Sequence, residues 1–265
     1  MTGAGARAVI TATEPGILIA SPGRMGKAVR LACAAILWLA FTGTGCMGAT
    51  DDADLQPGDE FEDTFVAAPD AVDAAELAGR QVIYVNFDGP TIRDCDNFCS
   101  NAPNNRSFII GRIWGSSRVD FAPYSGARTA ITEAIRRAYD RYNVRVTRSR
   151  PASGGYTMVV ISPTRGDHHG VAPLDCGNAN GRDIAFVYSI GSTSSATIAR
   201  YAVHELGHSF GLAHVVSASD YMQWASSGHD FTRSRYDTAH PSGKCFSGDV
   251  QRSRELLRNA LGLAP

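Results

Sequence analysis

The sequence lacks the features that mark nucleic-acid-binding and membrane-spanning proteins. Its 25 basic and 26 acidic residues leave a formal net charge of −1, so we expect no nucleic-acid partner. The apolar run Leu31–Phe41 is well short of the roughly 20 residues that a helix needs to cross a bilayer. No two cysteines have the CxxC spacing of a structural zinc site, which argues against a site built from four cysteines.

The composition is that of a globular protein. Hydrophobic residues make up 44% of the 265 residues and aromatic residues 9%, which is enough for a packed core. The length allows one domain of ordinary size together with a targeting segment and a linker.

The N-terminal region has the order of an export signal. The basic stretch Met25–Arg30 precedes the apolar run Leu31–Phe41, and the small residues of Thr42–Cys46 follow. Small residues before a cysteine resemble the lipobox of bacterial lipoproteins, which predicts acylation of Cys46. Gly43 stands where that pattern usually has leucine, so cleaved secretion is the alternative.

Residues 1–45 are therefore predicted to be a signal segment. Residues 1–24 push its apolar core too far inward, which favours Met25 as the true start. Residues 46–79 are acidic and rich in small residues, and they cannot bury enough apolar surface to offset their ordering entropy. We predict a flexible linker there; an inhibitory propeptide is the alternative, although no cysteine between Cys46 and Cys95 could block a metal.

Four cysteines follow Cys46 in the sequence. An even number in an exported domain favours two disulfides, and four cysteines allow three pairings. We favour Cys95 with Cys99, which closes a small loop, and Cys176 with Cys245.

Residues 80–265 contain the pattern of one catalytic domain. Apolar periodicity predicts strands over 81–87, 144–147, 157–162 and 183–188, and helices over 127–142, 194–210 and 250–261. The polar segments 91–107 and 163–181 are predicted to be loops.

The stretch from His204 to His214 is the most informative part of the chain. His204 and His208 lie four residues apart and therefore share one face of a helix. Gly211 permits a sharp exit from that helix, so His214 can return as a third ligand. Three imidazoles with one open position are typical of catalytic zinc. Glu205 is then placed to accept a proton from water as the catalytic base.

The motif HExxHxxGxxH is similar to the signature of the metzincin zinc endopeptidases. Met222, eight residues after His214, resembles the methionine turn of that clan, with spacing close to that of matrixins. The resemblance implies an α+β fold with a twisted mixed sheet, two long helices and a small irregular C-terminal subdomain ending in a helix. It also implies that the strand 184–188 forms the rim of the cleft, where an extended peptide would pair.

Two positions depart from the subfamilies of the clan. Val215 follows the third histidine, where matrixins have serine, adamalysins aspartate and astacins glutamate. Tyr221 precedes Met222, whereas the metal-reaching tyrosine of astacins and serralysins follows the methionine by two. The subfamily is therefore unassigned, and Tyr221 is not predicted to be a ligand.

Several other polar residues allow weaker hypotheses. His168 and His169 resemble the structural zinc loop of matrixins, although paired histidines in a loop are usually only solvated. Oxygens could surround a calcium ion at four positions, but Asn/Asp-rich turns are common without one; these positions are Asp175, Asn178, Asn180 and Asp183. Trp224 could line the pocket for the first primed side chain or pack in the lower subdomain. His229 and His240 are expected to be plain loop residues.

We therefore predict a secreted or lipid-anchored zinc endopeptidase of the bacterial envelope or the extracellular space. Its partner is a protein or peptide substrate, it contacts the membrane only through a lipid anchor, and we expect a monomer. A metal-binding surface lipoprotein without catalysis and a zinc amidase acting on cell-wall peptides are the alternatives. Glu205 argues against the first, because holding zinc does not require that carboxylate.

Overall fold

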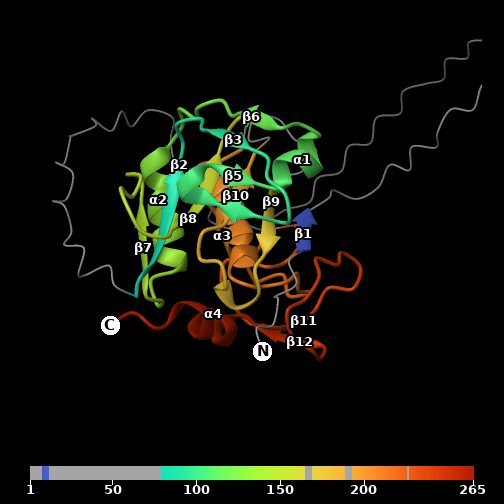
Figure 1. Cartoon of the computed structure of the whole chain (residues 1–265). Helices are drawn as coiled ribbons and strands as arrows, with labels where there is room; N and C mark the ends of the chain where they lie inside the picture. Colours follow the sequence, from blue (N-terminus) through green and yellow to red (C-terminus); the bar gives the residue numbers. More distant parts are fainter. Residues whose placement is uncertain (1–7, 12–78, 165–168, 189–192, 226) are drawn as a thin grey trace, which may run out of the picture. The chain divides into compact units, whose positions relative to one another are not determined.

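The computed structural model describes residues 8–11, 79–164, 169–188, 193–225 and 227–265 (Figure 1). The predicted cleavage region, Cys46 and almost all of the linker lie outside these residues. The predicted boundaries at 45 and 79 therefore stay predictions. No helix in the described part of the chain is long and apolar enough to cross a membrane.

A six-stranded mixed sheet forms the centre of the domain, with the order β1-β9-β10-β8-β2-β7. The strands are β1 (Ala8–Thr11), β2 (Gln81–Asn86), β7 (Val144–Thr147), β8 (Thr157–Ile161), β9 (Gly170–Leu174) and β10 (Ile184–Val187). The strands β10, β8, β2 and β7 run parallel, whereas β9 is antiparallel to β10 and β1 is antiparallel to β9. The predicted α+β class with a mixed sheet is confirmed.

The central strands are buried on both faces, as parallel strands usually are. Alternate residues of β2 point to opposite sides, so Ile83 and Val85 join one core cluster while Val82 and Tyr84 join the other. The first cluster lies between the sheet and the helices α2 (Arg128–Ala138) and α3 (Ser195–Ser209). Both helices fall within the ranges that the periodicity predicts, and α2 ends four residues earlier.

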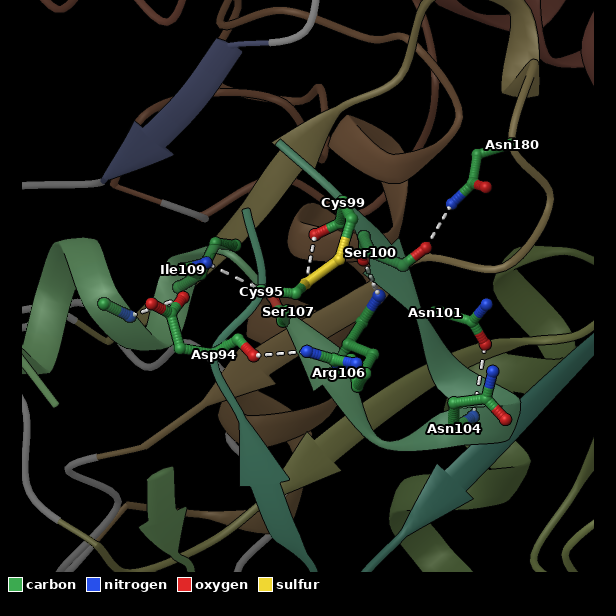
Figure 2. Close-up of a disulfide and its surroundings, with 12 residues drawn as sticks. Asp94, Cys95, Cys99, Ser100, Asn101, Asn104, Arg106, Ser107, Ile109 and Asn180 are labelled. Carbon is green, nitrogen blue, oxygen red and sulfur yellow. Dashed lines mark hydrogen bonds between the residues drawn. A yellow bond between two sulfur atoms is a disulfide. The ribbon is translucent and has the colours of Figure 1, made fainter. Parts of the chain in front are cut away.

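A second, smaller sheet covers the other core cluster. It has the order β4-β5-β3-β6, and its strands are β3 (Thr91–Arg93), β4 (Ser100–Asn101), β5 (Arg106–Ser107) and β6 (Arg118–Asp120). The 3-10 helix η1 (Ala102–Asn104) and helix α1 (Ile109–Trp114) belong to the same region. Figure 2 shows the disulfide Cys95–Cys99 between β3 and β4. The prediction of a plain loop over 91–107 was wrong, because polar side chains such as Asn101 cap short elements here.

Strand β9 corrects two further predictions. Residues 163–181 are not all loop, since Gly170–Leu174 form a fully buried strand. The strand 184–188 is not the rim, because β10 pairs with β8 on one side and with β9 on the other. Strand β9 packs beside the helix α3, and its other edge pairs with β1, which is the edge strand on this side of the sheet.

The C-terminal region has little regular structure. A two-stranded sheet pairs β11 (Arg233–Arg235) with β12 (Val250–Arg252), and α4 (Ser253–Leu261) follows directly. The last helix therefore starts three residues later than predicted, because Val250–Arg252 are taken by β12. The disulfide Cys176–Cys245 joins this region to η2 (Cys176–Asn178), and both disulfides have the pairing that the sequence favours.

Candidate metal centre

Helix α3 places two histidines on one buried face. The hydroxyl of Ser194 accepts a hydrogen bond from the Thr197 amide and caps the start of the helix. His204 and His208, one turn apart near its end, are both almost completely buried. The helix therefore presents two imidazoles to the same point from a rigid element.

Gly211 turns the chain out of α3 toward His214. Its φ of +90° is in the left-handed region that favours glycine. A Cβ there would also lie 2.8 Å from the Gly177 amide nitrogen and 3.0 Å from the Asp175 carbonyl oxygen, so the backbone of residues 175–177 leaves no room for a side chain. The turn brings the buried His214 back beside the two helix histidines.

Each of the three rings is oriented by a backbone carbonyl. The Nδ1 atoms of His204, His208 and His214 lie 2.8, 2.7 and 2.8 Å from the carbonyl oxygens of Tyr221, Leu212 and His240 respectively. Because a carbonyl oxygen only accepts, each Nδ1 carries the hydrogen and donates it. Each Nε2 is therefore left with an unshared lone pair, as a metal-binding histidine requires.

The three Nε2 atoms converge on one point. The Nε2 of His204 lies 3.1 Å from that of His208 and 3.1 Å from that of His214. No hydrogen is available between them, so these contacts are not hydrogen bonds. A tetrahedral zinc with Zn–N bonds of ~2.0–2.1 Å would space its nitrogen ligands about 3.3 Å apart. Within the described ranges, these three side chains form the group whose donor atoms could hold a metal ion.

Burial keeps the triad neutral. Desolvation, followed by the nearby His214, lowers the pKa of His204 from 6.5 to about 3. Desolvation also lowers the pKa of His208, with His204 and His214 adding to the shift, and desolvation lowers the pKa of His214. The neutral imidazole is the form that binds a metal, so the site is prepared to accept a cation at physiological pH.

Glu205 lies on α3 between the two helix histidines and is also buried. Desolvation raises the pKa of its carboxyl well above the usual value. Its Oε2 has no hydrogen-bond partner among the described residues, although a buried carboxylate without a partner is costly. A Cβ on Gly170, at the start of β9, would lie 2.5 Å from Oε1 of Glu205. The carboxylate thus fills the space that Gly170 leaves at the edge of the sheet.

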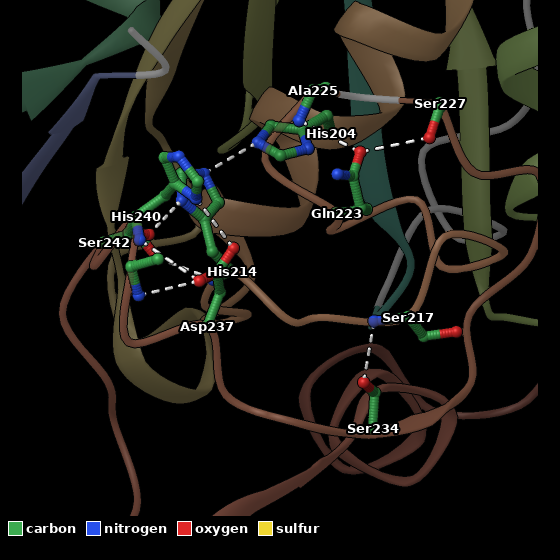
Figure 3. Close-up of polar contacts among 11 residues, drawn as sticks. His204, His214, Ser217, Gln223, Ala225, Ser227, Ser234, Asp237, His240 and Ser242 are labelled. Carbon is green, nitrogen blue, oxygen red and sulfur yellow. Dashed lines mark hydrogen bonds and ion pairs between the residues drawn. The ribbon is translucent and has the colours of Figure 1, made fainter. Parts of the chain in front are cut away.

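The chain beyond His214 forms hydrogen bonds with the backbone of His214. The His214 amide donates to the Ser242 hydroxyl at 2.6 Å, and the Asp237 amide donates to the His214 carbonyl at 3.0 Å (Figure 3). Met222 is fully buried, and its sulfur packs directly against Gly207 of α3. The methionine therefore packs against the helix that carries His204 and His208.

A family model matches the part of the chain that builds this centre. The metallo-peptidase family M12B, reprolysin-like, matches residues 120–215, which run from β6 through the sheet and α3 to the residue after His214. The match and the histidine triad support a metzincin-type metallopeptidase. Comparison with curated proteins gave no significant match, and neither did comparison with solved structures.

The matched model does not decide which metzincin subfamily the chain resembles most. The sequence spacing is nearest to matrixins, whereas the matching model is reprolysin-like. Val215, where the subfamilies differ, is fully buried here, and its amide donates to the Met222 carbonyl at 3.0 Å. An apolar residue suits this position because its side chain joins the first core cluster.

The weaker hypotheses gain less from the structure. His169 stacks on Tyr201, with ring centroids 4.7 Å apart, and His168 lies outside the described residues. The carboxylates proposed for calcium are engaged by Asn180: its amide donates to Asp175 at 2.8 Å and its side chain to Asp183 at 2.7 Å. The structure therefore adds no support for calcium.

Trp224 and His240 form a pair beside the third histidine. Their rings stack with centroids 3.9 Å apart, and the His240 Nδ1 lies 3.1 Å from the Asp237 carboxylate. His240 also supplies the carbonyl that orients His214, so it is more than the plain loop residue expected. His229 is exposed, as expected of a loop histidine.

Sequence reasoning missed the groups that hold the histidines. The groups that bond the histidines are the carbonyls of Tyr221, Leu212 and His240 and the Ser242 hydroxyl. Two further groups act on their neighbours: Gly170 leaves space for the Glu205 carboxylate, and the Asp220 carboxylate accepts the Met222 amide hydrogen. A backbone carbonyl has no residue type, so no motif could reveal the first three. Asp220 had a usable signal, because aspartate two residues before a turn amide is a common turn former.

Proposed function

We propose that the protein is an exported zinc-dependent endopeptidase in which His204, His208 and His214 hold the metal and Glu205 is the general base. The observation that carries the proposal is the meeting of three Nε2 lone pairs at the helix that also carries Glu205, whose buried carboxylate has an oxygen without a partner among the described residues. The donor set fits zinc, since three neutral imidazoles leave one coordination position open.

The chemistry follows from this arrangement. Zinc supplies a Lewis acid that lowers the pKa of water from ~16 toward ~7 and polarises a carbonyl. Glu205 accepts the proton of the attacking water and then delivers it to the leaving amide nitrogen. Burial raises the pKa of its carboxyl in the metal-free protein, and a nearby cation would shift that pKa downward and favour the ionised form.

The edge of β9 supports peptides as substrates. β9 starts at Gly170 against Glu205, and its outer edge already accepts an extended segment, since β1 pairs with it antiparallel from Thr11↔Val171 to Ala8↔Leu174. An extended peptide pairing along the same edge would pass the base.

Export is supported by the two disulfides, which persist in oxidising compartments. We propose acylation at Cys46 as the means of anchoring. Incorporation of a fatty-acid analogue that continues in Cys46→Ser would reject this assignment in favour of cleaved secretion.

The function is tested by profiling cleavage of a peptide mixture. We expect cleavage that a chelator abolishes and zinc restores, and we expect Glu205→Gln to lose activity by on the order of 10²–10⁴-fold while it still binds zinc. Glu255→Gln, an exposed glutamate on α4, is the matched control and should retain full activity. Equal activity in Glu205→Gln and the parent chain would reject Glu205 as the base.

A further inference from the structure

A buried carboxylate, Asp220, joins three parts of the C-terminal region beneath the histidines. Asp220 is fully buried, and its two oxygens accept four hydrogen bonds. Oδ1 accepts from the Met222 amide at 2.9 Å, and Oδ2 accepts from the Thr232 amide at 2.7 Å, the Thr232 hydroxyl at 2.8 Å and the Ser253 hydroxyl at 3.1 Å. One side chain thus ties the methionine turn to the residue before β11 and to the first residue of α4.

The turn that Asp220 holds is attached to the metal centre through two backbone carbonyls. The Tyr221 carbonyl accepts the Nδ1 hydrogen of His204 at 2.8 Å. The Met222 carbonyl accepts the amide of Val215, the residue after the third histidine, at 3.0 Å. A movement of this turn would therefore rotate the ring of His204 and shift the backbone beside His214.

Close packing leaves the turn little freedom apart from these bonds. Gly228 packs directly against the backbone of Asp220, and the Met222 sulfur packs against Gly207 of α3. The aspartate carboxylate has the right length and charge for its place, because all four of its contacts are donors. Asparagine would direct an NH2 group toward at least one donor and lose hydrogen bonds.

We propose that Asp220 is a positioning residue of the metal centre. It holds the Tyr221 carbonyl where that carbonyl keeps His204 in the Nδ1–H tautomer, with Nε2 aimed at the metal. The inference rests on the proposed zinc site, and it adds a residue that touches neither the metal nor the substrate. Groups that orient metal ligands in this way typically contribute 10–100-fold in metal affinity.

The test measures zinc affinity of the full chain by competition with a chromophoric chelator, without any substrate. We expect Asp220→Asn to raise the zinc Kd by about 10- to 100-fold. In the metal-free chain, the ring ¹⁵N shifts of His204 should report the Nδ1–H tautomer in the parent protein and a tautomer mixture in the variant. A role in stability alone would lower the melting temperature without changing this tautomer.

Asp94→Asn is the matched control. Asp94 also accepts a backbone amide, from Gly111 at 3.1 Å, but it belongs to the region of the second sheet. It should leave the zinc Kd unchanged; an equal rise in both variants would overturn the proposal, as would an unchanged Kd in Asp220→Asn.

If Asp220→Asn does not fold, variants that remove a single hydrogen bond to Asp220 test the proposal instead. Thr232→Val and Ser253→Ala each remove one hydroxyl donor to Asp220, and each should raise the zinc Kd by about two- to tenfold. An unchanged Kd in both would overturn the proposal. Because no substrate is used, a chain that binds zinc with this dependence but cleaves no peptide would contradict only the proposed function.

Discussion

The metal centre is assembled from two regions that are held together by different means. The first region, residues 79–211, carries His204, Glu205 and His208 on a helix that packs against the mixed sheet. The hydrogen bonds between the strands and the apolar clusters on both faces of the sheet hold this region together. The second, residues 212–265, brings His214 and the methionine turn, and it has only short strands and one helix. Its geometry depends on side chains such as Asp220 and Ser242 that bond to backbone groups.

This difference shows how an irregular segment can position a ligand as closely as a helix. In the first region the spacing of the two histidines follows from helix geometry. In the second, the backbone of His214 is bonded at three points, through its amide, its carbonyl and the amide of the next residue. Around His214, hydrogen bonds to specific side chains and backbone groups thus take the place of regular secondary structure.

The largest effect is expected at Gly170 in the first region, where the backbone packs closely against Glu205, the proposed base. Gly170→Ala adds a Cβ that would lie 2.5 Å from Oε1 and 2.6 Å from Cγ of Glu205, so the carboxylate must move. Because a displaced general base loses most of its contribution, we expect peptide cleavage to fall by on the order of 10²-fold with zinc binding retained.

Steady-state cleavage with a zinc titration checks this prediction, and Gly155→Ala is the control. The atoms nearest to a Cβ on Gly155 would be those of the flexible Arg182 side chain, at 3.2 Å, and the Gly181 carbonyl oxygen, at an ordinary contact distance of 3.7 Å. Unchanged activity in Gly170→Ala would mean that the backbone of β9 shifts to accommodate the added methyl group. The first region would then not be more rigid than the second, which is held by hydrogen bonds.

The two disulfides offer an intermediate test, since Cys95–Cys99 lies within the first region and Cys176–Cys245 joins the first region to the second. Cys176–Cys245 closes a span of 69 residues and ends near His240 and Ser242, whereas Cys95–Cys99 spans 4. Loop-closure entropy predicts a loss of about 4 kcal/mol of unfolding free energy for Cys176→Ser/Cys245→Ser and about 2 kcal/mol for Cys95→Ser/Cys99→Ser.

Urea unfolding measures these losses, and zinc competition separates the two bonds further. Only the 176–245 variant should weaken zinc binding, because the segment before Cys245 holds the amide and the ring of His214. Equal zinc affinity in both variants would show that the hydrogen bonds alone hold the third histidine.

The last effect is gradual, because it is spread over several pH units, and it tests whether the histidines of both regions are buried together. The folded pKa of His204 is lowered from 6.5 to about 3, so below pH 6.5 the unfolded chain binds a proton that the folded chain does not. The unfolding free energy of the metal-free protein should therefore fall as pH drops from 6.5 toward 3. His204 alone contributes about 1.4 kcal/mol per pH unit.

Chemical unfolding across this pH range, compared with variants, checks the prediction. His204→Gln should have a shallower slope, and the exposed His229→Gln should match the parent chain. Glu205 opposes the histidines, because its raised pKa lets the folded chain hold a proton that the unfolded chain loses above its ordinary value. Glu205→Gln should therefore make the unfolding free energy fall more steeply as the pH drops. An equal slope in His204→Gln and the parent chain would contradict the burial of His204 with the other histidines.

Much of the first region could be predicted from local patterns. Helix α3 and the strands β2, β7, β8 and β10 lie where periodicity places them, within two residues at each end, because each buries a regular apolar pattern. Strand β9 escaped prediction because Pro173 and the surrounding glycines resemble a loop, and Pro is tolerated only where a strand can lack an amide donor. The assignment of the rim to residues 184–188 failed for the same reason.

The sequence by itself determined the ligand types, the helix that carries two of them and the glycine that turns the chain toward the third, because these depend on residues that are close along the chain. Only the tertiary structure decided which carbonyls orient the rings, that β9 lies beside Glu205 and that Asp220 ties the methionine turn to α4. Those contacts join segments up to 35 residues apart (Glu205 and Gly170) through groups that most residue types share. Their partners are therefore set by how the whole domain packs.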